Sequence, residues 1–295
     1  MEKLGRLLTA MVTPFNEGMV DYKQAKKLAL ALLSSGSDGL VVSGSTGESP
    51  TLTGEEKLCL FTEMKSAVNK QGTVIAGTGS SSTAQSLGLT KEAERIGVDA
   101  CLLVVPYYNK PTQEGLYQHF KTIAQGTNLP CILYNVPSRT VTNLSADTII
   151  KLSQIDNIIG VKEASGNLDQ ISKIISNTGE DFFVWSGNDS DTLPIIALGG
   201  YGVISIASHL VGNQIREMIN HITAGRVDKA ASIHRYLLPL VNALFVVSNP
   251  IPVKYAVNYV GFNVGKPRLP LTEPDEKTAV FIKDILKNYQ IDLPV

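Results

Sequence analysis

Short apolar runs alternate with amphipathic stretches along the chain up to about residue 208. Eight runs are rich in β-branched residues, and several are apolar throughout, as expected of strands that are covered on both faces. The runs occupy residues 7–13, 39–43, 74–77, 100–105, 131–135, 158–163, 183–186 and 203–207. This alternation predicts repeated β-α units with parallel strands.

Helix-start signals lie between these runs. Asp21 can cap a segment with one apolar face, Thr53 and Glu56 have the spacing of a capping box, and Asn167 with Gln170 is a weaker version of that box. No G-x-G-x-x-G pattern follows the first run, which favours a closed barrel over an open doubly wound sheet. We therefore predict an α/β protein with a (β/α)8 TIM barrel.

The pattern after residue 208 is helical only. Helical periodicity covers residues 211–224, 226–247 and 276–289. Prolines break it at residues 249–252 and mark a loop over residues 267–274. The sequence thus predicts a catalytic barrel over residues 1–224 and a C-terminal helical domain over residues 225–295.

Composition describes an ordinary globular chain with a large core. Of the 295 residues, 43% are hydrophobic and 18% are charged, with a net charge of −1. A basic stripe for nucleic acid is absent, and the apolar run near the N-terminus is too short for a signal peptide or a membrane span. We expect a cytoplasmic protein with no nucleic-acid or membrane partner.

Cysteines and histidines show no metal-binding spacing. Cys59, Cys101 and Cys131 lie among apolar neighbours, which predicts reduced core thiols. The four histidines form no H-x-H or H-E-x-x-H pattern. We predict neither a metal site nor a cofactor, although ligands distant in sequence could converge in space.

Lys162 lies inside the apolar run of residues 158–164. A buried, unpaired ammonium is costly, so desolvation lowers the pKa of such a lysine and makes its amine a nucleophile toward carbonyl groups. The alternative is a lysine at a strand end that reaches solvent or pairs with Glu163. The residues around it decide between the two.

Polar residues follow several of the predicted strands, at the end of a barrel where active sites lie. A glycine turn over residues 44–48 offers backbone N–H groups and two hydroxyls to an anion, and Tyr108, Tyr134 and Arg139 follow or end two further strands. The Arg139 guanidinium is suited to binding a carboxylate as a fork. Each feature by itself is also compatible with an ordinary turn, a core tyrosine or a surface arginine.

Five segments together carry a family resemblance. GSTGESPTL (44–52), PYYNKPTQEGLYQHF (106–120), YNVPSRT (134–140), GVKEASGN (160–167) and NPIPVK (249–254) resemble the dihydrodipicolinate synthase family, in the right order over nearly the whole chain. The resemblance implies the pyruvate-dependent class I aldolase superfamily, a (β/α)8 barrel with a C-terminal helical domain, and a homotetramer built as a dimer of dimers.

The resemblance also implies roles for individual residues. Lys162 matches the lysine that forms the Schiff base, and Tyr134 matches the phenol that transfers protons during imine formation. Ser45 takes the place of a relay threonine, and Tyr108 matches the relay tyrosine contributed by a neighbouring subunit. The substrate-binding positions are Thr46 for the pyruvate carboxylate, Arg139 for the carboxylate of the aldehyde, and Gly187 and Ile204 in the pocket lining.

The implied reaction joins two small substrates. Lys162 condenses with pyruvate, a methyl proton is lost, and the enamine attacks L-aspartate-4-semialdehyde to give 4-hydroxy-tetrahydrodipicolinate for diaminopimelate and lysine synthesis. The rivals are another pyruvate aldolase, such as N-acetylneuraminate lyase or a 2-keto-3-deoxy-sugar-acid aldolase, and a catalytically idle barrel that senses carboxylates. The GSTGE turn also occurs in sialic acid lyases, whereas Arg139 after the strand-five tyrosine favours the synthase.

Regulation by lysine is expected to be weak or absent. Relatives with feedback inhibition use histidine and glutamate side chains at a site where this chain has Gly54, Lys57, Ser81 and Gln85. A cationic effector would meet another cation and no carboxylate there.

Overall fold

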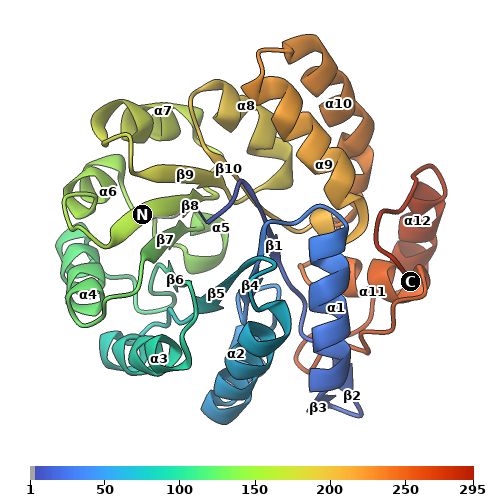
Figure 1. Cartoon of the computed structure of the whole chain (residues 1–295), viewed down its shortest axis with the longest axis horizontal. Helices are drawn as coiled ribbons and strands as arrows, with labels where there is room; N and C mark the ends of the chain where they lie inside the picture. Colours follow the sequence, from blue (N-terminus) through green and yellow to red (C-terminus); the bar gives the residue numbers. More distant parts are fainter. Residues whose placement is uncertain (1–3) are drawn as a thin grey trace. The chain divides into compact units, whose positions relative to one another are not determined.

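Eight parallel strands form one closed barrel in a computed structural model that describes residues 4–295 (Figure 1). The hydrogen-bonded order is β1-β10-β9-β8-β7-β6-β5-β4. The strands are β1 (Leu7–Ala10), β4 (Gly39–Val42), β5 (Thr73–Gly77), β6 (Ala100–Val104), β7 (Cys131–Asn135), β8 (Ile158–Glu163), β9 (Phe183–Ser186) and β10 (Gly202–Ser205). Each overlaps one predicted run, so the barrel prediction is confirmed; residues 1–3, with which the predicted barrel domain begins, lie outside the described residues.

Most barrel strands are buried along their whole length. Every residue of β1, β4, β7, β8 and β10 is buried. One side of a barrel strand faces the interior and the other faces the surrounding helices, which explains the continuous apolar runs in the sequence. Side chains that alternate along such a strand therefore have two separate buried environments.

Helices connect the strands and continue after the last one. They are α1 (Tyr22–Ser34), α2 (Gly54–Val68), α3 (Thr83–Ile96), α4 (Gln113–Gln125), α5 (Pro137–Thr140), α6 (Ala146–Leu152), α7 (Leu168–Asn177), α8 (Thr192–Ala197), α9 (Ser208–Thr223), α10 (Val227–Ala243), α11 (Ile251–Tyr259) and α12 (Glu276–Leu286). Short elements are β2 (Phe15–Asn16), β3 (Met19–Val20), η1 (Ser49–Thr51) and η2 (Asp189–Asp191). Among residues 4–295, no helix is both long and apolar enough to cross a lipid bilayer.

The predicted helix caps are confirmed. The Asp21 side chain accepts from the backbone N–H of Gln24, and Thr53 and Glu56 form a complete capping box at the start of α2. The Asn167 side chain accepts from the backbone N–H of Gln170. These caps satisfy N–H groups that have no partner within the helix, so they fix where each helix begins.

The predicted break near residues 249–252 is present, because α10 ends at Ala243 and α11 begins only at Ile251. Helix α11 itself was not predicted, and Pro252 lies in its first turn. A proline is tolerated there because the first N–H groups of a helix have no acceptor within the helix. Cys59 was predicted to be a core thiol, but it is exposed on α2, because the core-facing positions there are residues such as Leu60 and Met64.

The chain divides into two compact units, residues 1–74 with 205–295 and residues 75–204. In the first unit α1 packs on α2, α9 packs on α10, and α12 packs on both α10 and α11. In the second unit α3, α4, α6 and α7 pack as successive neighbours. The predicted boundary between barrel and helical domain at residue 224 stays a prediction.

Candidate active site

Lys162 lies on β8 beside Tyr134 of β7. The two residues are register partners on neighbouring strands, and the Lys162 Nζ lies 4.4 Å from the centroid of the Tyr134 ring. Both side chains are buried, with Lys162 only 4% exposed. The strand pairing therefore brings an amine and a phenol-bearing ring together away from solvent.

Burial changes the proton affinity of this amine. Desolvation lowers the pKa of Lys162 from 10.5 to about 8, with a smaller lowering by Arg139 and an opposing contribution from the Asp189 carboxylate. A pKa of about 8 leaves about one tenth of the amine neutral at pH 7, roughly 300 times more than a solvated lysine. Lys162 is thus poised to attack a carbonyl carbon near neutral pH.

Glu163 is not the partner of Lys162. Its carboxylate is fully buried and accepts from the Asn135 Nδ2, the Ser165 backbone N–H at 2.7 Å and the Gln170 Nε2 at 3.1 Å. Burial raises the pKa of Glu163, and these hydrogen bonds oppose the rise. Because Glu163 and Asn135 are also register partners, their contact holds β7 and β8 together one residue beyond Tyr134 and Lys162.

The other predicted site residues of this unit lie at strand ends. Arg139 is exposed on α5, which follows β7 directly, and Ile204 is fully buried on β10. Gly187 follows β9 at a place where a Cβ would lie 2.6 Å from the Ala164 Cβ, so only glycine fits without a shift. Tyr108 follows β6, is 94% exposed and has a left-handed backbone with φ of 75°.

Ser45 and Thr46 belong to the other compact unit, in the turn that follows β4. Ser45 is partly exposed, whereas Thr46 is 3% exposed. Within residues 4–295 the backbone N–H groups of Ser45, Thr46 and Gly47 donate to no other protein group. The turn is held from outside by the Thr13 hydroxyl, which donates to the Gly47 carbonyl at 2.6 Å, and it ends in Glu48 with a left-handed φ of 57°. Such a turn can bind an anion.

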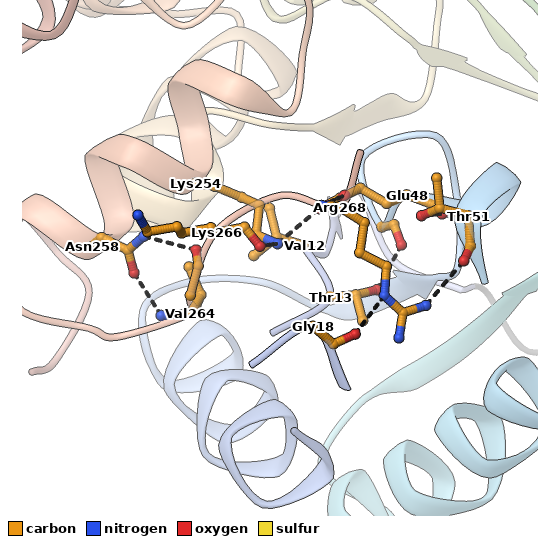
Figure 2. Close-up of polar contacts among 12 residues, drawn as sticks. Val12, Thr13, Gly18, Glu48, Thr51, Lys254, Asn258, Val264, Lys266 and Arg268 are labelled. Atoms are coloured by element: carbon orange, nitrogen blue, oxygen red, sulfur yellow. Dashed lines mark hydrogen bonds and ion pairs between the residues drawn. The ribbon is translucent and has the colours of Figure 1, made fainter. Parts of the chain in front are cut away.

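A buried ion cluster follows the same turn (Figure 2). Glu48 and Lys254 are each 1% exposed, and the Lys254 Nζ lies 2.7 Å from the Glu48 Oε1. The Arg268 backbone N–H donates to the Glu48 Oε2 at 2.8 Å, and the Arg268 guanidinium binds the Thr51 carbonyl and the Glu56 carboxylate. The cluster satisfies the buried carboxylate from two sides.

Sequence reasoning did not single out Asn249, Lys254 or Asp189 as part of the site. The Asn249 Nδ2 donates to the Thr46 Oγ1 at 3.0 Å, and Asp189 is buried in η2. For Lys254 a signal existed, because it stands in the apolar stretch IPVKYAV just as Lys162 stands in an apolar strand. No sequence signal points to the contact between Asn249 and Thr46, which are far apart along the chain.

Known proteins resemble this chain along its whole length. A family model described as the dihydrodipicolinate synthetase family matches residues 3–289. A 4-hydroxy-tetrahydrodipicolinate synthase of Dehalococcoides mccartyi is 68% identical over 296 residues, with all of both chains covered, and one of Moorella thermoacetica is 55% identical, with 95% of this chain and 98% of that protein covered.

Solved structures agree with the sequence relatives. A dihydrodipicolinate synthase structure from Bacillus anthracis is 46% identical with a TM-score of 0.96, and the match covers 98% of this chain and 100% of that one. One from Aquifex aeolicus is 44% identical with a TM-score of 0.96, covering 98% and 99%. The chain therefore belongs to the dihydrodipicolinate synthetase family.

Proposed function

We propose that this chain condenses pyruvate with L-aspartate-4-semialdehyde through a Schiff base on Lys162 and so forms 4-hydroxy-tetrahydrodipicolinate. Full-length relatives at 67–68% identity are named for the synthesis of this product. The observation that carries the chemistry is the buried Lys162 amine, with its pKa lowered to about 8, beside Tyr134. Such an amine can form an imine with a keto acid.

The first step joins Lys162 to pyruvate. The neutral amine attacks the keto carbon, a C–N bond forms, and the keto oxygen leaves as water after it has been protonated. Tyr134 serves as the proton donor and acceptor, with Ser45 and Tyr108 as relays for the proton. The Thr46 turn binds the pyruvate carboxylate, and Gly187 and Ile204 line the pocket.

The second step makes the new carbon–carbon bond. Loss of a methyl proton from the imine gives an enamine, and its carbon attacks the aldehyde carbon of the second substrate. Arg139 binds the carboxylate of that substrate as a fork. The amine of the substrate then attacks the imine carbon, closes the ring and releases Lys162. The protonated imine on Lys162 accepts the electron pair left by the methyl proton, so the proposed route uses no metal and no organic cofactor.

The assembly is proposed to be a homotetramer built as a dimer of dimers. Tyr108 supports this arrangement, because an aromatic side chain that is 94% exposed and held in a left-handed backbone is suited to a neighbouring subunit. Analytical ultracentrifugation measures the oligomeric state directly, and a monomer would contradict the proposed homotetramer. We also propose a cytoplasmic location, since the free thiols Cys59, Cys101 and Cys131 suit a reducing compartment.

Reductive trapping tests the proposed function. Borohydride added with pyruvate is expected to leave a stable adduct on the peptide that contains Lys162, detected by mass spectrometry, and pyruvate-dependent consumption of aspartate semialdehyde is expected in a steady-state assay. Absence of the adduct would contradict the Schiff base. Faster cleavage of N-acetylneuraminate than consumption of aspartate semialdehyde would assign the chain to the rival aldolases.

Lysine is proposed to inhibit weakly or not at all. Gly54, Lys57, Ser81 and Gln85 place one ammonium group and no carboxylate at the positions that match a feedback site. The structure from Cyanidioschyzon merolae, 46% identical, was solved with lysine bound, so binding of lysine does occur in a relative. Strong inhibition at sub-millimolar lysine in a steady-state assay would overturn the proposal.

A further inference from the structure

We propose that Asn249 is a positioning residue that acts through Thr46 and turns the proton of the Thr46 hydroxyl toward the carboxylate of bound pyruvate. The proposal rests on the proposed function, in which Thr46 binds that carboxylate. It concerns one hydrogen bond between residues 203 positions apart in the sequence. Both residues belong to the same compact unit.

The direction of this hydrogen bond carries the argument. The Asn249 Nδ2 donates and the Thr46 Oγ1 accepts at 3.0 Å. A threonine hydroxyl has one proton, so an oxygen that already accepts from Asn249 has its own proton left for another acceptor. Within residues 4–295 the Thr46 hydroxyl makes no other hydrogen bond. That proton is therefore available to an incoming carboxylate.

Burial makes this orientation persistent. Thr46 is 3% exposed and Asn249 is 5% exposed, so water competes little for either group. The backbone N–H groups of Ser45, Thr46 and Gly47 also donate to no other protein group within residues 4–295. The hydroxyl proton and these N–H groups present positive partial charge to a bound anion, and the N–H groups of the Asn249 amide add to that positive charge.

A second contact holds Asn249 in place. Asn249 comes just before α11, and Lys254 of that helix forms the buried ion pair with Glu48, two residues after Thr46 (Figure 2). The start of α11 is thus joined to the turn at two points, by Asn249 to Thr46 and by Lys254 to Glu48. Two such ties restrict the turn more than the single hydrogen bond could.

Substitutions of Asn249 test the proposal through substrate-specific kinetics. Asn249→Ala is expected to raise the KM for pyruvate about 10-fold, the loss of one oriented hydrogen bond to a charged group. Asn249→Asp is expected to raise it about 100-fold, because the carboxylate accepts the Thr46 proton and repels the ligand. The KM for aspartate semialdehyde and the kcat at saturating pyruvate are expected to change by less than about threefold.

A double-mutant cycle separates positioning from a merely structural role. Thr46→Val alone is expected to raise the KM for pyruvate, and adding Asn249→Ala to it is expected to change the KM by less than about twofold. The proposal would be overturned if the two substitutions together raised the KM for pyruvate by the product of their separate effects. It would also be overturned if Asn249→Ala raised the KM of both substrates equally. Asn249→Leu keeps a similar side-chain shape without the amide donor and replaces Asn249→Ala in the cycle if that variant does not fold.

Asn258→Ala is the matched control. Asn258 also lies on α11, and its side chain forms two hydrogen bonds, from its Nδ2 to the Gly265 carbonyl and to its Oδ1 from the Val264 N–H. This variant is expected to lose stability without a rise in the KM for pyruvate. Trapping of the wild type with borohydride is the reference experiment. If no pyruvate adduct forms, the proposed function is refuted. If the adduct forms but the two substitutions act independently in the cycle, only the role of Asn249 is refuted.

Discussion

Within residues 4–295 two lysine side chains are buried, one in each compact unit, and their surroundings differ. Lys254 forms an ion pair with Glu48 and donates to the Lys266 carbonyl. The Lys162 amine lies over the ring of Tyr134 and, within residues 4–295, forms neither a hydrogen bond nor an ion pair. Both amines are therefore desolvated, but only Lys254 is hydrogen-bonded to a carboxylate.

This difference separates a structural lysine from a reactive one. Burial lowers the pKa of both groups, but at Lys254 the Glu48 carboxylate opposes the change through charge and hydrogen bonding. At Lys162 the opposing Asp189 contributes less than burial, and the pKa falls to about 8. A paired ammonium stabilises contacts between segments, whereas an unpaired one is available as a nucleophile once its proton is lost.

The largest expected effect comes from removing the reactive amine. Lys162→Met is expected to reduce pyruvate-dependent turnover by at least about 1000-fold and to abolish the borohydride adduct, because no other group replaces the covalent route. The same variant is expected to stabilise the fold by about 1–3 kcal/mol at pH 7, since it removes a buried unpaired charge. Steady-state kinetics and chemical denaturation measure the two outcomes.

The pH dependence of that stabilisation provides the control. The folded-state pKa of about 8 lies below the value of about 10.4 for an unfolded lysine. The stability gained by Lys162→Met is therefore complete below pH 8 and disappears as the pH rises toward about 10.4. A Lys162→Met variant that is less stable than the wild type at pH 7 would show that Lys162 is structurally compensated like Lys254.

Removing the structural lysine is expected to have the opposite effect on stability. Lys254→Met leaves the buried Glu48 carboxylate without its ammonium partner and is expected to destabilise the fold by about 3–5 kcal/mol. Adding Glu48→Gln removes the uncompensated charge and is expected to recover part of the loss. Denaturation curves of the single and double variants measure this, and a stable Lys254→Met variant would contradict the comparison.

The rate of imine formation is expected to follow the titration of Lys162. Below pH 8 the rate rises about tenfold per pH unit as the neutral fraction grows, and above pH 8 it levels off. Stopped-flow trapping of the pyruvate adduct between pH 6 and 10 measures the profile. A rise that continues up to about pH 10 would show that the amine behaves as a solvated lysine.

The smallest effect is expected from the one carboxylate that acts on Lys162. Asp189→Asn removes a negative charge that favours the ammonium form, so the pKa of Lys162 is expected to fall further and the midpoint of the profile to move to lower pH by about half a pH unit. A shift to higher pH would mean that Asp189 acts through structure rather than charge. Asp191→Asn, on the same short helix, is the matched control and is expected to leave the midpoint unchanged.

Most of the fold could be predicted because its signals are local. Short apolar runs marked all eight strands, and side-chain caps such as Asp21 and Thr53 marked helix starts. The start of α11 was missed because prolines are helix breakers everywhere except in the first turn, and position within a helix is not apparent before the helix is known. Cys59 was misplaced because apolar neighbours in sequence alternate between buried and exposed faces.

Part of the site could be predicted for a different reason. Lys162 was singled out because an ammonium in an apolar strand is expensive wherever that strand lies. Whether Glu163 pairs with Lys162 depends on which face of β8 each side chain occupies. The strand register places Glu163 opposite Asn135, and the Asn135 amide binds its carboxylate. Asp189 gives no such signal, since a carboxylate in a polar segment of the sequence resembles any solvated residue, and only the fold buries it.

The sequence by itself determined the barrel, the family and the unusual position of Lys162, because periodicity, capping and the cost of burying a charge all act on neighbouring residues. Only the tertiary structure decided which of the two buried lysines is paired. The contacts of Lys254 with Glu48 and of Asn249 with Thr46 join residues more than 200 positions apart, and such long-range pairing is set by how the whole chain packs.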